Sequence, residues 1–334
     1  MTTLPTYEVV ESAVRLAGRA PSLHNSQPWR WVFDGYQLQL FSARERMLPA
    51  TDTLGRQMII SCGIALGHLR TALAAAGWRI FLARFPDPNR GDHLAAIRFT
   101  PAPIVTDAER DRAAAITQRH TDRLPLAPPN GWDEFEIVLR STFDPADGVL
   151  DVLPEDKRPQ LARASELTAS LRRYDSSYQH ELRWWTGHVV ADTGVPAETL
   201  ISPEERVGVP VGRTFPAADI GPRRPGAVDQ ATILVLSTGT DQHMDLLRCG
   251  EVLSTVLLEC TLAGYATCPL THLTEIPRSR AVVATLTGRK QLPQALIRVG
   301  TAPESADRPT PTPRLPLADI LELTGPGAEA RTLP

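Results

Sequence analysis

A short stretch near the N-terminus concentrates the polar groups that a flat ligand needs. Residues 20–29 read Ala-Pro-Ser-Leu-His-Asn-Ser-Gln-Pro-Trp, and the two prolines exclude regular secondary structure. An asparagine amide both donates and accepts a hydrogen bond, as the edge of a flat heterocycle requires, and Asn25 is one of only three asparagines in the chain. The same side chains would also suit a loop that satisfies its own backbone. The residues alone leave both interpretations open.

A second cluster, Arg119-His120-Thr121-Asp122-Arg123, has the composition of a phosphate site. Two guanidinium forks and one hydroxyl within this run offer charge-assisted hydrogen bonds to phosphate oxygens. A charged helix end is the other interpretation of the same residues.

Other common catalytic signatures are missing from the sequence. It has no Gly-rich dinucleotide fingerprint after a strand, no phosphate-binding P-loop, no paired-histidine zinc motif and no serine nucleophile elbow. The eight histidines lack the spacing of metal ligands, so we expect no metal site.

Length and composition indicate a globular protein of roughly two domains, because 334 residues exceed the usual size of one. Apolar residues make up 42% of the chain, enough to bury a core, and the net charge of −3 argues against nucleic acid or an anionic membrane as a partner. No apolar run reaches the ~18 residues of a membrane span, and the N-terminus does not resemble a signal peptide. We therefore expect a cytoplasmic protein with reduced, buried thiols. Its cysteines, none in a CxxC pair, are Cys62, Cys249, Cys260 and Cys268.

Apolar periodicity predicts a mixture of helices and strands that can position these clusters. The predicted helices span residues 7–18, 57–76, 106–118, 132–143, 159–185 and 246–263. The predicted strands span residues 29–33 and 36–41, on either side of an Asp34-Gly35 turn, and residues 149–153, which follow Asp147-Gly148.

The two halves of the chain look like copies of each other. Cys62-Gly63 and Cys249-Gly250 each precede a second glycine at the same spacing, and an Asp-Gly hairpin is expected before the long helix in both halves. The remaining matches are Ala96-Ile97-Arg98 with Leu296-Ile297-Arg298, and Ala102-Pro103 with Ala302-Pro303. Because the matches occur in the same order and their period is far too long for a solenoid, they predict a duplication folded as a pseudo-twofold pair.

The second half carries a long insertion. Gly35 and Gly63 lie 28 residues apart, whereas Gly148 and Gly250 lie 102 residues apart. Part of the extra chain, residues 194–226, is rich in proline and glycine and has no periodicity. Such a long irregular segment is typical of a lid or binding loop, and the alternatives are an outer wrap or disorder. Its apolar residues include Val207, Val209, Val211 and Phe215, and its charged ones Arg206 and Arg213.

The run from Pro21 to Trp29 resembles the signature loop of the FMN-dependent nitroreductase superfamily, and the layout of nearly the whole chain is similar to its mycobacterial Acg family. The resemblance implies an α+β nitroreductase-like fold. Ordinary members are homodimers with two FMN sites at the subunit interface. One subunit supplies the loop, and the other supplies an Arg-rich motif, a segment after a long helix and a C-terminal basic residue.

The resemblance assigns cofactor-binding roles residue by residue. The expected FMN contacts are Pro21, Ser22, Leu23, His24 and Asn25 from the loop, Arg119, Thr121 and Arg123 from the Arg-rich motif, Pro269, Leu270, Thr271 and His272 beside the flavin N5 edge, and Arg314 at the phosphate. His272 is a candidate proton donor to a reduced flavin or a packing residue. Arg19 and Arg183 are candidates for the positively charged or N–H donor group beside the flavin N1 atom and C2 carbonyl.

Each half lacks the FMN-binding motifs that the other half contains, so the sequence predicts a single FMN site. The first half (residues 1–105) supplies the loop, and the second half (residues 106–334) supplies the phosphate-binding arginines and the predicted lid. Two fused halves would form a pseudo-dimer, so we expect a monomer. The expected function is an NAD(P)H-dependent nitroreductase or oxidoreductase acting on a small acceptor. The alternative is an FMN-sequestering or redox-storage protein with a covered flavin and little turnover.

Overall fold

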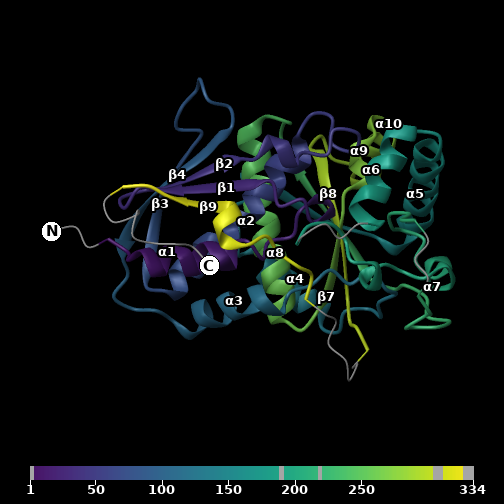
Figure 1. The fold of residues 1–334 in the computed structure, drawn as a ribbon. Coiled ribbons are helices and arrows are strands. Elements are labelled where there is room, and N and C mark those ends of the chain that lie inside the picture. Colours follow the sequence, from purple (N-terminus) through teal and green to yellow (C-terminus); the bar gives the residue numbers. More distant parts are fainter. Residues whose placement is uncertain (1–3, 188–191, 217–219, 304–310, 326–334) are drawn as a thin grey trace.

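A computed structural model of the chain describes residues 4–187, 192–216, 220–303 and 311–325 and shows an α+β fold with two β-sheets (Figure 1). The first sheet has the strand order β3-β4-β2-β1-β9, and the second has the order β5-β6-β8-β7. The first four strands are β1 (Trp29–Phe33), β2 (Leu38–Ser42), β3 (Trp78–Arg84) and β4 (His93–Pro101). The others are β5 (Val149–Leu153), β6 (Thr232–Thr238), β7 (Ala266–Leu270), β8 (Leu292–Gly300) and β9 (Leu321–Leu323).

The two sheets share one topology. Neighbouring strands pair antiparallel in both sheets, with registers such as Trp31 opposite Leu40 and Leu234 opposite Ile297. The order β3-β4-β2-β1 therefore matches the order β7-β8-β6-β5. Only β9 departs from this pattern, because it comes from the C-terminal part of the chain and pairs parallel with β1.

Two long helices cross in the middle of the molecule, α2 (Arg56–Ala75) and α8 (His243–Leu262) (Figure 1). A Cβ atom on Gly63 would overlap the carbonyl oxygen of Leu247, and one on Gly250 would overlap that of Ile60. The contact is reciprocal, since each glycine meets the carbonyl three residues before the other glycine. Glycine at both positions lets the two backbones touch.

Among the other described helices, those up to residue 187 fall in the predicted spans, whereas those at residues 203–207, 272–275, 277–287 and 317–320 lie where no helix was predicted. Local signals explain their starts: the Thr6 hydroxyl accepts from the Val9 N–H, and Thr106 forms a capping box with Glu109. The helices are α1 (Tyr7–Ala17), α3 (Asp107–Gln118), α4 (Trp132–Arg140), α5 (Arg158–Arg173), α6 (Ser176–Gly187), α7 (Pro203–Val207), α9 (His272–Glu275), α10 (Pro277–Thr287) and α11 (Leu317–Ile320).

Two predictions about local structure were wrong. Residues 159–185 form two helices rather than one, because the Asp175 carboxylate accepts from the Tyr178 N–H and starts α6. The two Asp-Gly pairs are also not equivalent. Asp34-Gly35 joins β1 to β2, whereas Asp147-Gly148 precedes β5, whose antiparallel partner β6 begins only at Thr232. The insertion therefore occupies the position that the short β1–β2 turn has in the first sheet.

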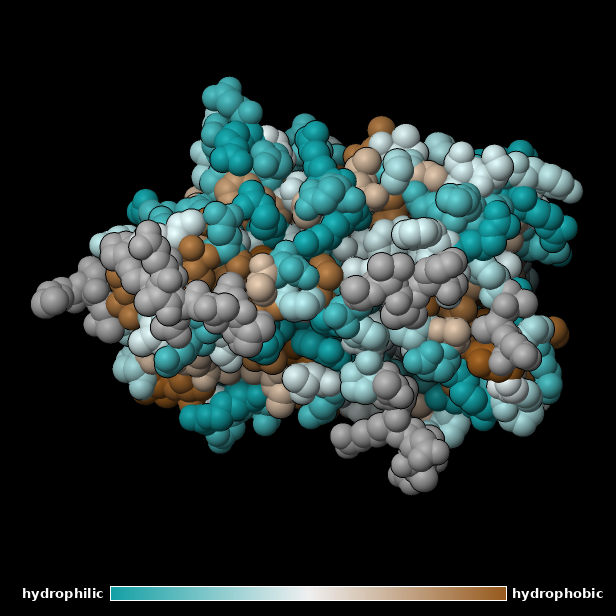
Figure 2. All heavy atoms as spheres, in the orientation of Figure 1, coloured by the Kyte–Doolittle hydropathy of each residue, from teal (hydrophilic) through white to brown (hydrophobic). Residues whose placement is uncertain are grey.

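One hydrophobic core joins the two sheets. It includes Trp31 and Leu40 from the first sheet, Leu234 and Ile297 from the second, and the facing sides of α2 and α8. Among the described helices, α2 alone is long and apolar enough to cross a membrane, but 78% of its apolar window is buried inside the protein. The visible face is mostly hydrophilic, with hydrophobic side chains in separate patches (Figure 2). All four cysteines are buried and unbridged, as predicted.

Candidate functional site

The loop after α1 has an unusual backbone. His24, Asn25 and Gln27 have φ angles of 52°, 59° and 50°, a region that side chains other than glycine disfavour. The Ser22 hydroxyl accepts from the Gln27 N–H at 2.9 Å and closes the loop. Pro21 is the residue immediately before Ser22. Left-handed residues gathered in one loop are typical of functional sites, where the surrounding structure holds the strain.

Contacts from distant parts of the chain hold this loop. The Leu23 N–H donates to the Ser61 hydroxyl of α2 at 3.4 Å. The Asn25 amide donates to the Pro313 carbonyl at 3.1 Å, and the Gln27 amide donates to the Asp192 carbonyl at 2.9 Å. Two of the loop's amide side chains therefore bond the backbone of remote segments, whereas the second interpretation of this segment expected bonds to the loop's own backbone.

Three arginines from separate segments meet beside this loop. Arg314 donates to the carbonyls of Gly18 and Arg19 at 3.0 and 3.1 Å, and Arg19 donates to the carbonyl of Thr312 at 3.4 Å. Arg119, which ends α3, is 6% exposed, and its buried Nε and Nη1 atoms have no hydrogen-bond partner among the described residues. We call Arg19, Arg119 and Arg314 the arginine cluster.

The arginine cluster lacks a negative partner among the described residues. Burial, with repulsion from Arg119 and Arg19, lowers the pKa of Arg314 to about 9. Burial and repulsion from Arg19 lower the pKa of Arg119 to about 10. Buried charges are normally paired, so the cluster has the electrostatics of a site for an anion.

The Arg-rich motif runs alongside β7. Thr121 forms a β-bridge with Thr267, and the Asp122 N–H donates to the Thr267 carbonyl at 2.9 Å. This pairing brings residues 119–123 next to the strand that contains Pro269 and Leu270. Two segments that the resemblance assigned to one site are thus neighbours.

Arg123 lies near Phe215 of the predicted lid, and Phe215 in turn lies near His24 of the loop. The Arg123 guanidinium carbon lies 5.4 Å from the centre of the Phe215 ring, and the His24 ring lies 6.0 Å from the same ring. Both nitrogens of His24 are buried and have no partner in the described part of the chain, and burial together with Arg213 and Arg123 lowers the pKa of His24 well below the usual value. His24 is therefore neutral at physiological pH, which reduces charge repulsion with these arginines.

A buried ion pair supports the backbone of Arg123. Arg298 of β8 donates from Nε to Asp229 Oδ2 at 3.0 Å, and both side chains are almost fully buried. The same guanidinium donates to the carbonyls of Arg123 and Leu124 at 3.3 and 2.7 Å. Because these bonds hold the carbonyls, they fix the direction in which the chain leaves the Arg-rich motif.

The segment from Pro269 to His272 ends β7 and begins α9. The Thr271 hydroxyl donates to Glu275 at 2.9 Å and accepts from Arg213 at 3.1 Å. His272 is 4% exposed, and its Nε2 atom lies 2.9 Å from the Ser165 hydroxyl of α5. This segment therefore contacts both the insertion and the predicted lid.

Arg213 fastens the predicted lid to this segment. It forms a buried ion pair with Glu275 and also donates to the Tyr178 hydroxyl at 2.8 Å. Burial alone would lower the pKa of Arg213, but the interactions with Glu275 and Tyr178 together outweigh burial and raise it. Within the predicted lid, residues 217–219 lie outside the described part of the chain.

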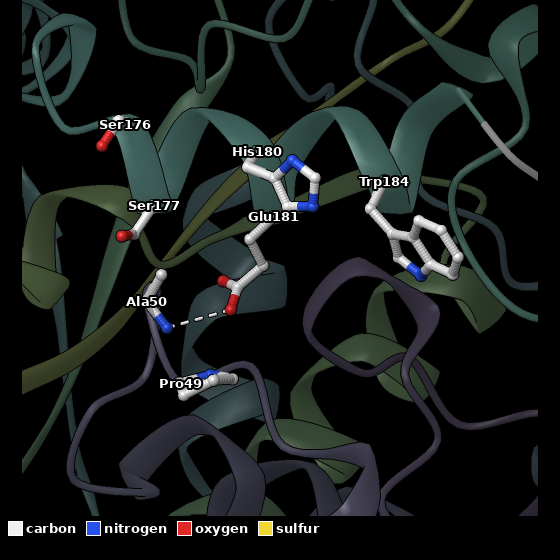
Figure 3. A pocket seen from close by; sticks show the side chains of 7 residues that line it. All are labelled: Pro49, Ala50, Ser176, Ser177, His180, Glu181 and Trp184. Carbon is white, nitrogen blue, oxygen red and sulfur yellow. Dashed lines mark hydrogen bonds between the residues drawn. The ribbon is translucent and has the colours of Figure 1, made fainter.

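A large open groove lies elsewhere, between residues 49–50 and α6 (Figure 3). It has a volume of about 560 Å³, and its lining is Pro49, Ala50, Ser176, Ser177, His180, Glu181 and Trp184. None of the predicted cofactor residues lines it. The Glu181 carboxylate accepts from the backbone N–H groups of Ala50 and Thr51, both at 2.9 Å, so its charge is already used in joining α6 to the first half.

Sequence reasoning missed several groups near the site. Of the two arginines that were candidates for the group beside N1, Arg19 lies near Arg119, whereas Arg183 is exposed on α6. His68 of α2 lies close enough to Arg119 and Arg314 for their charges to lower its pKa, after the larger effect of burial. A lone histidine within an apolar helix gave no signal of this proximity.

The chain matches no family model. The Mycobacterium tuberculosis protein named "Putative NAD(P)H nitroreductase acg" is 50% identical over 322 residues, which cover 96% of this chain and 97% of that protein. A second M. tuberculosis protein, also named a "Putative NAD(P)H nitroreductase", is 39% identical over 330 residues, which cover 96% of this chain and 93% of that one.

Solved structures show more distant likeness. The FMN-dependent nitroreductase NfnB from Mycobacterium smegmatis, solved with NADPH, is 16% identical with a TM-score of 0.38 and covers 64% of this chain and 97% of its own. The FMN- and NADPH-dependent NfnB from Sphigopyxis is 18% identical with a TM-score of 0.39 and covers 64% and 99%.

Proposed function

Because the chain belongs to the mycobacterial Acg family of the FMN-dependent nitroreductase superfamily, we propose that it binds one FMN in a site built from both halves. The arginine cluster carries this proposal. Three buried or half-buried guanidinium groups meet without a carboxylate among the described residues, and Arg119 keeps two unpartnered nitrogens. A dianionic phosphate supplies the charge and the hydrogen-bond acceptors that these groups need.

The phosphate end of the cofactor fits residues from both halves. Arg119 and Arg314 would bind phosphate oxygens, and Arg19 would add a third positive charge. The hydroxyls of Ser22 and Thr121 lie in the two segments that flank the cluster. A site of this kind requires the first and second halves to be folded together.

The ring end fits the groups around Arg123. The Arg123 guanidinium would lie beside the flavin ring of FMN, where its positive charge favours the anionic reduced flavin. The segment from Pro269 to His272 would line one edge, with Leu23 and His24 from the loop nearby. FMN supplies the hydride and electron chemistry, and the protein supplies position, charge and exclusion of water.

The two halves are also proposed as a duplication that replaces a homodimer. The matching strand orders and the reciprocal contact of Gly63 with Gly250 support this proposal. The pairing of β9 with β1 ties the C-terminal segment to the first sheet. If the pseudo-twofold interface is internal, the chain is a monomer in solution.

A second candidate function is flavin storage beneath a closed lid. The contact of Phe215 with His24 and Arg123, and the buried pair of Arg213 with Glu275, favour a lid that packs over the ring end. Nicotinamide must stack on the flavin for direct hydride transfer, so a closed lid would slow reduction by NAD(P)H. A closed lid would also keep an electron acceptor from reaching the reduced flavin.

The first experiment is the visible spectrum of the purified protein, with the FMN released and counted. We expect a yellow protein with one FMN per chain and a monomer in sedimentation equilibrium. Two FMN per chain would contradict the single site, and a stable dimer at micromolar concentration would contradict the pseudo-dimer. A colourless protein that takes up no added FMN would overturn the proposal.

Anaerobic reduction then separates an oxidoreductase from a storage protein. Fast reduction by NADPH or NADH, followed by reoxidation with a nitroaromatic or quinone, identifies an enzyme. Slow reduction by both, with normal reduction by dithionite, identifies a covered flavin. Replacing residues 194–226 with a short Gly/Ser linker should then accelerate reduction by nicotinamide. An unchanged rate with FMN still bound would exclude the lid as the barrier.

A further inference from the structure

His272 lies where the second half, the insertion and the predicted lid meet. It is the first residue of α9, immediately after Thr271, and its side chain is 4% exposed. Its Nε2 atom lies 2.9 Å from the Ser165 hydroxyl, whereas no described residue provides a hydrogen-bond partner for its buried Nδ1 atom. The ring is therefore hydrogen-bonded at one nitrogen and has no partner among the described residues at the other.

The bonds around Ser165 determine which nitrogen carries the proton. A serine hydroxyl has one hydrogen to donate. If Ser165 donates to the Gly212 carbonyl, at 3.1 Å, then its oxygen accepts from the Gly212 N–H at 3.4 Å and from His272 Nε2–H. Every group in this arrangement has a partner except the lone pair of His272 Nδ1.

The opposite arrangement leaves more groups unsatisfied. If Ser165 donated to His272 Nε2, the Gly212 carbonyl would lose this hydrogen, and His272 would carry a buried, unpartnered Nδ1–H. Buried N–H groups without a partner are rarer and more costly than buried acceptors without one. The geometry therefore favours the Nε2–H tautomer.

The imidazole also stays neutral. Burial, followed by repulsion from Arg213, lowers the pKa of His272 to about 3. A neutral imidazole whose hydrogen lies on Nε2 and is donated to Ser165 carries no proton on Nδ1, so Nδ1 cannot act as a proton donor. This state does not suit the proton-donor role that the sequence suggested for His272.

We infer that His272 is a fixed hydrogen-bond acceptor, which presents Nδ1 to a ligand edge that carries an N–H or O–H group. The inference rests on the proposed FMN site for the identity of that ligand. The flavin N5 atom is an acceptor in oxidised FMN and carries a hydrogen once two electrons and a proton have been taken up. An acceptor beside that edge therefore favours reduced over oxidised FMN and raises the midpoint potential.

Ser165 is a positioning residue in this arrangement. It belongs to α5 of the insertion, and its hydroxyl links Gly212 of the predicted lid to His272. Removing the hydroxyl frees the ring to adopt either tautomer. A residue of the insertion thus determines whether the Nδ1 atom of His272 donates or accepts a hydrogen bond.

The test uses the FMN-loaded protein and compares His272→Phe, Ser165→Ala and Ser165→Thr. We expect His272→Phe to weaken binding of reduced FMN about tenfold relative to oxidised FMN, the scale of one hydrogen bond, so the midpoint potential becomes more negative. Ser165→Ala should shift the potential in the same direction by less, and Ser165→Thr should restore it. Ser279→Ala is the matched control, because Ser279 is equally buried and donates to the Ile276 carbonyl of its own helix start.

A second measurement needs no cofactor. ¹⁵N NMR of the protein labelled at histidine distinguishes Nε2–H from Nδ1–H, and His272→Phe assigns the signal. An Nδ1–H tautomer in the wild-type protein would overturn the inference, as would an unchanged potential in a His272→Phe protein that still binds FMN. A wild-type protein that binds no FMN would overturn both the proposed function and the redox preference.

Discussion

The arginine cluster and the groove beside α6 differ in both shape and charge. The groove is open and offers a volume of about 560 Å³, but its carboxylate, Glu181, already accepts from two backbone N–H groups. The arginine cluster is packed against neighbouring segments, yet its charges have no acidic partner among the described residues. The comparison teaches that unsatisfied buried charge indicates a ligand more directly than empty volume does, because it represents an interaction that the fold alone does not complete.

The largest expected effect comes from Arg119→Met. FMN affinity should fall about 10- to 150-fold, because one charged hydrogen bond contributes about 1.5–3 kcal/mol. The free energy of unfolding without FMN should rise by about 1 kcal/mol, because a buried charge without a partner has been removed. Fluorescence titration and urea unfolding measure the two quantities. Arg112→Met is the control, since Arg112 of α3 is paired with Glu259 at 2.6 Å and should leave FMN affinity unchanged.

Arg314→Ala should weaken FMN binding by a similar amount, about 1.5–3 kcal/mol. Arg314 also bonds the carbonyls of Gly18 and Arg19, so part of the loss would come from a looser loop. The double variant Arg119→Met/Arg314→Ala shows whether the two arginines act on one phosphate. Losses that simply add would indicate independent sites and would contradict a shared phosphate.

A smaller effect is expected from inorganic phosphate in the protein without FMN. At equal ionic strength, phosphate should raise the free energy of unfolding over chloride by about 1 kcal/mol, because an anion that binds only the folded state stabilises it. Thermal or urea unfolding measures the difference. The stabilisation should vanish in Arg119→Met, and equal stabilisation of both proteins would mean that phosphate acts elsewhere.

The smallest effect on FMN binding is expected from the groove. Glu181→Gln should lower the free energy of unfolding by about 1 kcal/mol, because two N–H groups lose a charged acceptor, and should change FMN affinity by less than twofold. Trp184→Ala should also leave FMN affinity within twofold. A loss above tenfold in either variant would make the groove part of the ligand site and would reverse the comparison.

Local signals in the sequence predicted the helices up to residue 187, α8 and the strands β1, β2 and β5, but not the other described helices and strands. Prolines ended regular structure around residues 20–29, Thr106 and Glu109 started α3, and the Asp34-Gly35 turn joined β1 to β2. These signals depend on neighbouring residues, so the sequence contains them in full. Prediction failed at Asp147-Gly148 because the partner of β5 is a strand that begins only at Thr232. The break between α5 and α6 was also missed, although its signal, the Asp175 cap, is local.

In the candidate site too, the sequence determined some features and only the tertiary structure determined the others. The sequence determined which residue types are present: the loop with Asn25, the Arg-rich motif and Arg314. Only the tertiary structure brought Arg314 against Arg19, 295 residues away, and left Arg119 buried without a partner. It also linked Ser165 to His272, 107 residues apart, which set the tautomer of that ring. Hydrogen bonds and burial depend on distances between remote segments, and those distances exist only after the two halves have packed around α2 and α8.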